Sequence, residues 1–381
     1  MKRAGLVILG SGMAGYGLLR AMRRSGVPTA VTLITRDDGA AYLRSDLAPG
    51  LAGRRDARDL RLATAAQMAY RLEAEIITQQ AVHEIDREHR LIRMQDGEIA
   101  YERLVIATGG EPRRPGWLKG SATDQLLTIS SLAEYSYFNT VIAGRRRVAV
   151  LGGSLAGCEL AGNLCAAGLQ VTLFEPAAQL AQDLLPTLCA KFGERALAAS
   201  GVRILCEEGL QRVDQGADAL DLLTLAGARC STDVVVAALG STPRTALALA
   251  AGLEVGHGVR VDKRLATSDP SIFAIGECAE FEKRTIDLPE DIDQAARVLA
   301  SVLGGEPGRM MVWRPTLRRA RLARCPAIIC EPPNVAGEWH ERATHHGVTA
   351  EFHDREGDLR GFALMGTASG DSERLLRRMA H

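Results

Sequence analysis

Short, continuously apolar runs recur along the chain, and several of them end in glycine. Residues 6–9 form one such run, a glycine-rich turn follows over residues 10–15, and residues 16–22 form an apolar segment that is compatible with a helix. A continuously apolar run is typical of a parallel strand that is buried on both faces. The pattern therefore predicts a strand, a tight turn and a helix in succession.

This first turn has the glycine spacing that a dinucleotide pyrophosphate requires. The first glycine permits the tight turn, the second admits the phosphates to the backbone, and the third lets the helix pack on the strand. The start of the helix supplies unpaired N–H donors and partial positive charge to the anion. The turn predicts a dinucleotide site, although a tight turn that binds nothing would share the pattern. Its residues are Gly10, Ser11, Gly12, Met13, Ala14 and Gly15.

A second copy of the pattern begins about 140 residues later, at residue 147. Its turn consists of Gly152, Gly153, Ser154, Leu155, Ala156 and Gly157. Ser154 stands at the middle glycine position, where its small side chain still allows close approach. The next strand, at 171–174, ends in Glu175, whose carboxylate could bind the adenosine ribose and repel the 2′-phosphate of NADP. Glu175 therefore predicts that the second turn binds NADH in preference to NADPH. Alternatively, Glu175 is only a surface carboxylate at the end of a strand.

Two further segments make the pattern specific. Residues 101–109 end in Ala107, Thr108 and Gly109, and residues 267–278 contain an apolar strand that ends in Gly276 and Glu277. With the two glycine turns, the chain resembles the flavoprotein reductases with two dinucleotide domains, in which FAD occupies the first and NAD(P)H the second. The resemblance implies an α/β fold with two Rossmann-like dinucleotide-binding domains and a small C-terminal α/β domain.

The resemblance also implies domain boundaries. The FAD domain is expected at 1–112 and 235–308, the NAD domain at 113–234, and the C-terminal domain at 309–381. A proline- and glycine-rich connector at 111–120 opens the NAD domain, and an apolar strand within 233–244 returns the chain to the FAD domain. Taken alone, that strand could be any buried parallel strand.

Matching positions imply further FAD contacts. Asp37 would bind the adenosine ribose, although it could simply begin a turn. Arg44 would approach the pyrophosphate and the flavin, and Ser45 replaces a proline that is usual there. Besides the first glycine turn, the implied set is Thr35, Arg36, Asp37, Arg44, Ser45, Val82, Ala107, Thr108, Gly109, Gly240, Gly276, Glu277 and Pro289.

The cysteines narrow the branch of the family. None of the eight belongs to a CxxC pair, and none lies within 40–53 or 109–151, where disulfide reductases of this superfamily place a reactive cysteine. Electrons should therefore leave the flavin directly. The near pair Cys325 and Cys330 has an apolar spacer that predicts a buried strand rather than a redox pair. The chain most resembles NADH:rubredoxin and flavorubredoxin reductases, through 33–39, 42–47, 242–252 and 275–280.

This branch implies two catalytic residues and one partner. Arg321 would place a cation near the pyrimidine edge of the flavin, and Glu159, expected in the first turn of the NAD helix, would lie near the nicotinamide. The stretch 313–324 holds five arginines and no acid, so it could steer a small acidic iron protein such as rubredoxin to the flavin edge. A solvated arginine-rich face is an equally good reading.

Three departures weaken a simple transfer of the family's properties. Glu277 stands where aspartate is usual, and arginine, leucine and alanine replace Lys-Thr-Pro at Arg321. Asp287 and Glu290 suggest a capping box at the helix aimed at the flavin, where Glu290 and Asp291 would repel a reduced flavin. The alternatives are therefore a ferredoxin- or nitrite-type reductase, or an FAD- and NAD-binding protein without turnover.

Composition adds limits of its own. The chain is 46% hydrophobic and 24% charged with a formal net charge of zero, which argues for a soluble globular protein and against a nucleic-acid-binding surface. No apolar run has the length of a membrane span, and the start of the chain leaves no room for a signal peptide. We expect a cytoplasmic monomer or homodimer without a metal site.

Overall fold

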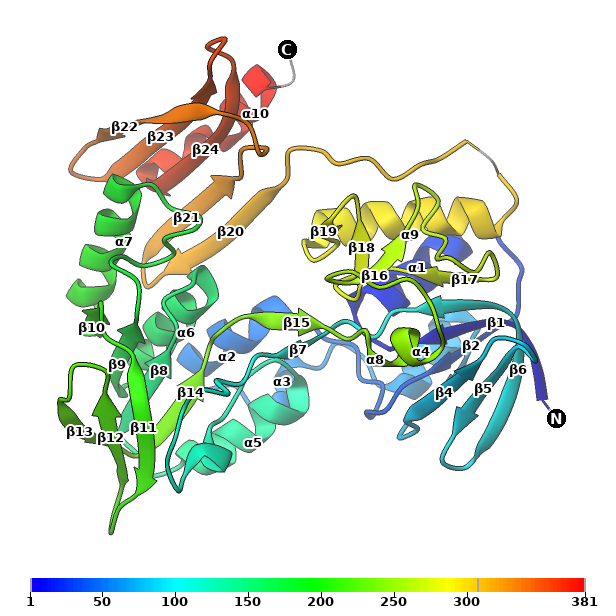
Figure 1. Ribbon diagram of the computed structural model, residues 1–381, viewed down its shortest axis with the longest axis horizontal. Helices are drawn as coiled ribbons and strands as arrows, with labels where there is room; N and C mark the ends of the chain where they lie inside the picture. The colour runs from blue at the N-terminus through cyan, green and yellow to red at the C-terminus, as the bar shows by residue number, and fades with distance from the viewer. Residues whose placement is uncertain (1, 307, 380–381) are drawn as a thin grey trace. The chain divides into compact units, whose positions relative to one another are not determined.

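The computed structural model describes residues 2–306 and 308–379, and it has a mixed α/β architecture (Figure 1). It divides into two compact units. The first unit comprises residues 2–43, 61–111 and 241–314, and the second comprises residues 44–60, 112–240 and 315–379. The outer ends of the predicted domains, at 1 and 380–381, lie outside the described residues.

The first unit is built on a largely parallel sheet. The strands follow the order β3-β2-β1-β6-β5-β4, and β17 also pairs with β6. The elements of the unit are β1 (Lys2–Leu9), α1 (Met13–Arg24), β2 (Val31–Ile34), α4 (Ala65–Leu72), β3 (Glu75–Ile77), β4 (Val82–Asp86), β5 (Leu91–Met94), β6 (Gly97–Ile106), β7 (Gly110–Pro112), β15 (Ser241–Pro243), α8 (Ala246–Ala250), β16 (Val259–Val261), β17 (Ile272–Ala274), β18 (Ala279–Phe281), β19 (Arg284–Thr285) and α9 (Pro289–Leu303).

The sheet explains the continuously apolar runs. Strand β1 pairs in parallel with β2 on one side and with β6 on the other. Val7 and Ile8, whose side chains point to opposite faces, are both 0% exposed. The later half of β6 pairs with β17, and α1 packs against α9. The predicted order of strand, glycine turn and helix is confirmed.

The second unit contains three separate sheets. A parallel sheet has the order β10-β9-β8-β14, and two antiparallel sheets have the orders β11-β12-β13 and β20-β21-β24-β23-β22. The elements are η1 (Arg44–Asp46), α2 (Leu47–Ala52), α3 (Ala57–Leu60), η2 (Thr123–Gln125), α5 (Leu132–Ile142), β8 (Arg147–Leu151), α6 (Leu155–Ala166), β9 (Gln170–Glu175), α7 (Thr187–Ala199), β10 (Arg203–Cys206), β11 (Leu210–Gln215), β12 (Leu220–Thr224), β13 (Arg229–Thr232), β14 (Val234–Ala237), β20 (Leu317–Leu322), β21 (Cys325–Cys330), β22 (Gly337–Ala343), β23 (Gly347–Asp354), β24 (Leu359–Gly366), η3 (Thr367–Asp371) and α10 (Ser372–Met379).

The C-terminal sheet packs on the helices of the parallel sheet within this unit. Strand β20 contacts α6, and β22 and β23 contact α7. The carboxylate of Glu341 accepts hydrogen bonds from the N–H groups of Leu188 and Cys189 at 2.7 and 3.2 Å, in the first turn of α7. A carboxylate at this position satisfies helix donors that have no partner within the helix. The C-terminal segment thus clusters with the parallel sheet, and the predicted three-domain division stays a prediction.

Two local predictions were wrong. Helix α9 begins at Pro289 with Leu288 at the N-cap and no side-chain cap, so Asp287 and Glu290 do not form the predicted capping box. Proline is well suited to the first helical position, since its N–H is not needed there and its φ is already helical, and this moves the helix start beyond Asp287. The run at 54–61 mixes arginine with aspartate, which predicts a solvated helix face, but only Ala57–Leu60 is helical within it.

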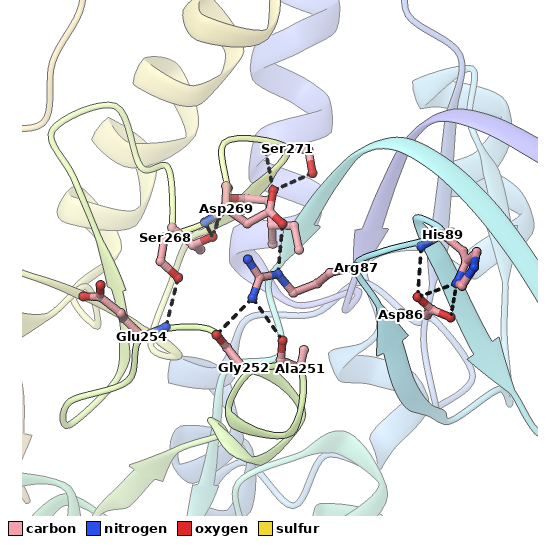
Figure 2. A network of polar contacts seen from close by, with 11 residues as sticks. Asp86, Arg87, His89, Ala251, Gly252, Glu254, Ser268, Asp269 and Ser271 are labelled. Carbon is pink, nitrogen blue, oxygen red and sulfur yellow. Dashed lines mark hydrogen bonds and ion pairs between the residues drawn. The ribbon is translucent and has the colours of Figure 1, made fainter.

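A polar network ties distant segments of the first unit together (Figure 2). The guanidinium of Arg87 donates to the carboxylate of Asp269 at 2.9 Å. It also donates at 3.0 Å to the carbonyl of Gly252, which lies two residues after the end of α8 in the chain. Burial alone would raise the pKa of Asp269, but hydrogen bonds from Ser271 and from Arg87 lower that pKa below its ordinary value. Arg87 therefore joins the β4–β5 hairpin to the part of the unit that follows residue 241.

We expect Arg87→Met to lower the free energy of unfolding by about 1–3 kcal/mol, since the partly buried carboxylate of Asp269 loses a charged donor. The pKa of Asp269 is depressed in the native protein, so its contribution is complete above about pH 4 and is lost as the pH falls. Thermal unfolding at several pH values should show the full loss of stability of Arg87→Met, relative to the wild type, at pH 7 and a smaller loss near pH 3. Arg24→Met, at an exposed position of α1, is the control. Equal stability of the two variants would contradict the prediction.

Candidate functional site

The first glycine turn forms a tight backbone cradle between β1 and α1. Gly10 has a φ of +116°, and a Cβ at that position would overlap the carbonyl of Ala107. A Cβ at Gly15 would overlap the carbonyl of Gly10, whereas a Cβ at Gly12 would meet nothing within 4 Å. Two glycines are therefore required by packing, while the third faces open space at the start of the helix. This is the arrangement that admits a pyrophosphate.

Polar side chains close one side of this cradle. The hydroxyl groups of Ser11 and Thr35 lie 2.9 Å apart, and both lie within hydrogen-bonding distance of the Asp37 carboxylate, at 3.0 and 2.7 Å. The N–H group of Gly39 donates to the same oxygen of Asp37 at 3.0 Å. Asp37 thus both begins a turn and fixes an acceptor beside the glycine loop, so the two readings of this residue are compatible.

Two more predicted segments meet the cradle. The N–H group of Ala107 donates to the carbonyl of Leu9 at 2.9 Å, which places the end of β6 beside the turn. A Cβ at Gly276 would lie 2.7 Å from the Cβ of Ala14, so the end of β17 packs directly on the loop. The first unit therefore brings together the glycine turn, residues 107–109 and residues 276–277, which lie far apart in the sequence.

The remaining residues predicted to contact FAD are more scattered. Val82 is partly buried in β4, Arg36 is exposed after β2, and Pro289 is exposed at the first position of α9. Arg44, Ser45 and Gly240 belong to the second unit. Their contacts with a cofactor stay predictions.

The second glycine turn repeats the cradle between β8 and α6. Gly152 has a φ of +104°, and a Cβ at that position would lie 2.8 Å from the carbonyl oxygen of Ala238. Ser154 has a φ of −60° and a ψ of 166°, which any residue can adopt, and its hydroxyl accepts from the N–H group of Gly157 at 3.3 Å. Serine therefore replaces the middle glycine without strain and caps the helix as well.

Glu175 lies at the end of β9, against this second turn. Its carboxylate accepts from the N–H group of Gly153 at 2.5 Å and from that of Ala177 at 2.8 Å. An ionised carboxylate has about four acceptor sites, so two backbone donors leave it able to accept ribose hydroxyls. The two backbone bonds fix its direction.

The structure brings the two predicted catalytic residues, Glu159 and Arg321, into contact within the second unit. Glu159 lies in the second turn of α6, not in the first turn as predicted. Its carboxylate accepts from the backbone N–H group of Arg321, on β20, at 3.2 Å. Burial raises the pKa of Glu159, and the hydrogen bond and charge of Arg321 oppose that effect. The Arg321 side chain itself is exposed.

Because burial raises the native pKa of Glu159, its ionisation costs stability as the pH rises above its ordinary value of 4.5. We expect Glu159→Gln to escape this cost, so that its melting temperature relative to the wild type increases between about pH 4.5 and neutrality. Melting curves across this range test the prediction, with Glu88→Gln on an exposed turn as the control. A difference that does not change with pH would contradict it.

The cysteines of the described residues carry no disulfide. Cys325 and Cys330 lie in one strand, β21, as the apolar spacer predicted. They are five steps apart along the strand, a separation of roughly 16 Å, so they cannot pair within it. Burial raises the pKa of both thiols.

Among residues 2–306 and 308–379, no helix has both the length and the apolar content that a bilayer crossing requires.

Sequence reasoning missed two residues that lie against Glu277. Gly110 and Ser241 both contact its carboxylate, yet the sequence assigned no role to either, although Gly110 follows the turn at 107–109 and Ser241 lies within 233–244. The available signal was the extra methylene of Glu277, which requires additional space and a donor. With these residues, the fold and the two glycine cradles define an oxidoreductase with two dinucleotide sites.

Comparison with known proteins identifies the family. Residues 4–298 match the model of the pyridine nucleotide-disulphide oxidoreductases, and residues 321–379 match a rubredoxin-binding C-terminal domain. The chain belongs to the pyridine nucleotide-disulphide oxidoreductase family and carries this C-terminal domain. This confirms the predicted fold and enzyme class, with FAD and NADH as cofactors.

Individual relatives match this chain over nearly their whole length. The chain is 31% identical to rubredoxin-NAD(+) reductase of Alcanivorax borkumensis, with 98% of each chain covered. It is 33% identical to the nitric oxide reductase FlRd-NAD(+) reductase of Aeromonas hydrophila, covering 98% of this chain and 96% of the relative. A solved ferredoxin reductase from Rhodopseudomonas palustris shares the fold with a TM-score of 0.88 at 23% identity, covering 97% of this chain and 92% of that one. The predicted resemblance is confirmed.

Proposed function

We propose that this protein is a reductase that passes electrons from NADH, through bound FAD, to rubredoxin or a rubredoxin-like iron protein. The observation that carries the proposal is the combination of two glycine cradles with a rubredoxin-binding C-terminal domain in one chain. The names of the relatives, a rubredoxin-NAD(+) reductase and an FlRd-NAD(+) reductase, support the same donor and acceptor.

The first cradle fits the pyrophosphate of FAD. Gly12 faces open space, and the Ser11, Thr35 and Asp37 side chains offer fixed polar groups beside it. Ala107, Thr108 and Gly109 would border the cofactor, and Glu277 would hold its ribityl chain. FAD bound there would supply hydride acceptance and the release of single electrons.

The second cradle fits NADH. Its glycines approach the pyrophosphate, and Glu175 would bind the adenosine ribose and disfavour the phosphate of NADPH. Glu159 would orient the nicotinamide, and the guanidinium of Arg321 would stabilise negative charge on the reduced ring. The protein's own part in the reaction is to orient the two rings and to set the charge around them.

The arginine-rich strand β20 leads into the rubredoxin-binding domain, whose match begins at residue 321, near the end of the strand. Arg319 and Arg321 are two residues apart, so they lie on the same face of the strand, and both are exposed. A positive surface of this kind increases the rate of encounter with an acidic protein. We propose that the acceptor docks here and that the reaction takes place in the cytoplasm.

The decisive experiment is reoxidation of the NADH-reduced protein in a stopped-flow instrument. Rubredoxin should reoxidise the flavin at least 10 times faster than ferredoxin at equal concentration, and air should be slower than either. Faster reoxidation by ferredoxin would favour a ferredoxin-type reductase, which shares the fold. If the protein binds FAD but NADH does not bleach the bound flavin, the protein is neither a rubredoxin reductase nor a ferredoxin-type reductase.

A further inference from the structure

Glu277 has one methylene more than the aspartate that the resemblance leads us to expect, and the structure shows where the extra length is accommodated. Its carboxylate lies against Gly110, the residue that follows the turn at 107–109. A Cβ at Gly110 would be 2.5 Å from both Cδ and Oε1 of Glu277, and 2.8 Å from Oε2. Real Cβ atoms do not approach other heavy atoms so closely. Any larger residue at position 110 would therefore displace the carboxylate.

Glycine at position 110 is required by space and not by backbone conformation. The preceding glycine, Gly109, has a φ of +66°, but a Cβ at Gly109 would meet nothing within 4 Å. Gly110 shows the opposite combination, because its φ lies outside the left-handed region and its missing Cβ is replaced by the Glu277 side chain. Alanine at position 110 would thus leave the backbone unstrained and disturb only the carboxylate.

Ser241 fixes the same carboxylate from the other side. Its hydroxyl donates a hydrogen bond to Oε1 of Glu277. Ser241 is held near the turn at 107–109 because Arg244, three residues later, donates two hydrogen bonds to that turn. The backbone N–H group of Arg244 donates to the carbonyl of Gly109 at 2.9 Å, and its guanidinium donates to the carbonyl of Thr108 at 3.0 Å. The donor and the vacant Cβ position are therefore held together in the first unit by hydrogen bonds between 108–109 and Arg244.

We infer that Gly110 and Ser241 are positioning residues that let a glutamate do the work of the shorter aspartate in the flavin site. Gly110 supplies the volume for the carboxyl group, which the additional methylene carries farther out, and Ser241 selects one orientation of a side chain that has an additional rotatable bond. The inference rests on the proposed function, since it assumes that the Glu277 carboxylate is the group presented to the ribityl chain.

A compensation experiment tests the role of Gly110. FAD-free protein of the wild type, Gly110→Ala, Glu277→Asp and the double variant is titrated with FAD, and flavin fluorescence reports the dissociation constant. We expect Gly110→Ala to weaken FAD binding about 10-fold or more. Glu277→Asp shortens the side chain by one methylene and so withdraws the clashing carboxyl group, and the double variant should bind FAD within about threefold of Glu277→Asp alone. An unchanged affinity in Gly110→Ala, or a double variant no better than Gly110→Ala, would overturn the inference.

Ser241 is tested with a conservative pair. Ser241→Ala should weaken FAD binding about 3- to 10-fold, and Ser241→Thr, which keeps the hydroxyl, should restore most of it. Equal affinities in these two variants would overturn the role of the hydroxyl. Gly308→Ala, at an exposed position with no neighbour within 4 Å, is the control for adding a methyl group.

Melting temperatures of the FAD-free proteins separate this inference from the proposed function. The clash at Gly110 exists without cofactor, so Gly110→Ala should lower the melting temperature and Glu277→Asp should recover it. If the wild type binds no FAD and this recovery is still seen, the proposed function fails while the fit of the three residues stands. Without the recovery, the inference fails whatever FAD does.

Discussion

Replacing Gly15 by alanine is expected to give a protein that is purified without yellow flavin and binds added FAD at least 100-fold more weakly than the wild type. A Cβ at this position would overlap the carbonyl of Gly10 and would lie 3.6 Å from the Cγ2 of Ile8. Both neighbours belong to the strand and turn that form the cradle, so neither can move without opening it. Since the electrons are proposed to pass through the flavin, NADH-dependent turnover should fall in proportion to the loss of FAD.

Gly12→Ala distinguishes an effect on the packing of the protein from an effect on the access of the FAD pyrophosphate to the backbone. Its Cβ would meet no protein atom within 4 Å, so the FAD-free protein should melt at the wild-type temperature. The methyl group would nevertheless stand where the pyrophosphate approaches the backbone, so FAD binding should still weaken. Gly308→Ala should change neither property. If Gly15→Ala retains wild-type affinity, or if Gly12→Ala binds FAD normally, the first cradle is not the cofactor site.

The parts of the fold that could be predicted are those encoded locally. The runs that became β1 and β8 are apolar because both faces of a parallel strand are buried, and the glycines that follow are required by backbone contacts within a few residues. Ser154 could be accepted in advance for the same reason, as its position needs no left-handed backbone. Local rules also failed locally, as at α9, where Pro289 set the helix start in place of Asp287.

The parts that could not be predicted depend on contacts between distant segments. Glu159 and Arg321 are separated by 162 positions, and their hydrogen bond uses the backbone of Arg321, which carries no sequence signal. Ser241 lies 36 positions from Glu277, in the segment at 233–244 that was predicted only as a strand returning to the FAD domain. In both cases the sequence identified the carboxylate and only the fold supplied its donor, because hydrogen-bond partners in a core are chosen by topology.

The arginines of 313–324 allow two readings, which a charge reversal can separate. Strand β20 is an edge of the five-stranded sheet, and charged side chains on an edge strand prevent pairing with other chains. If that is their purpose, removing positive charge should promote aggregation and leave electron transfer unchanged. If the arginines steer an acidic acceptor, the effect should appear in the rate of association and depend on salt.

We expect the double variant Arg319→Glu/Arg324→Glu to reduce kcat/KM for rubredoxin about 10- to 100-fold at low ionic strength, because it makes the surface more negative by four charges. The loss should shrink at about 0.5 M salt, where opposite charges are screened. Turnover with an uncharged quinone should be unaffected, since a neutral acceptor feels no steering. Arg321 is left unchanged, so that its proposed effect on the flavin does not enter the comparison.

Arg229→Glu is the matched control, because Arg229 is exposed on β13, which belongs to a different sheet of the same unit. It should alter rubredoxin turnover by less than about twofold. A double variant that reduces rubredoxin normally but aggregates would assign these arginines to edge protection. A loss that salt does not relieve, or that is shared by the quinone, would mean that the substitutions disturb the site itself and not the approach of the acceptor. Only a salt-sensitive loss confined to the charged acceptor makes β20 and the turn that follows it the docking surface.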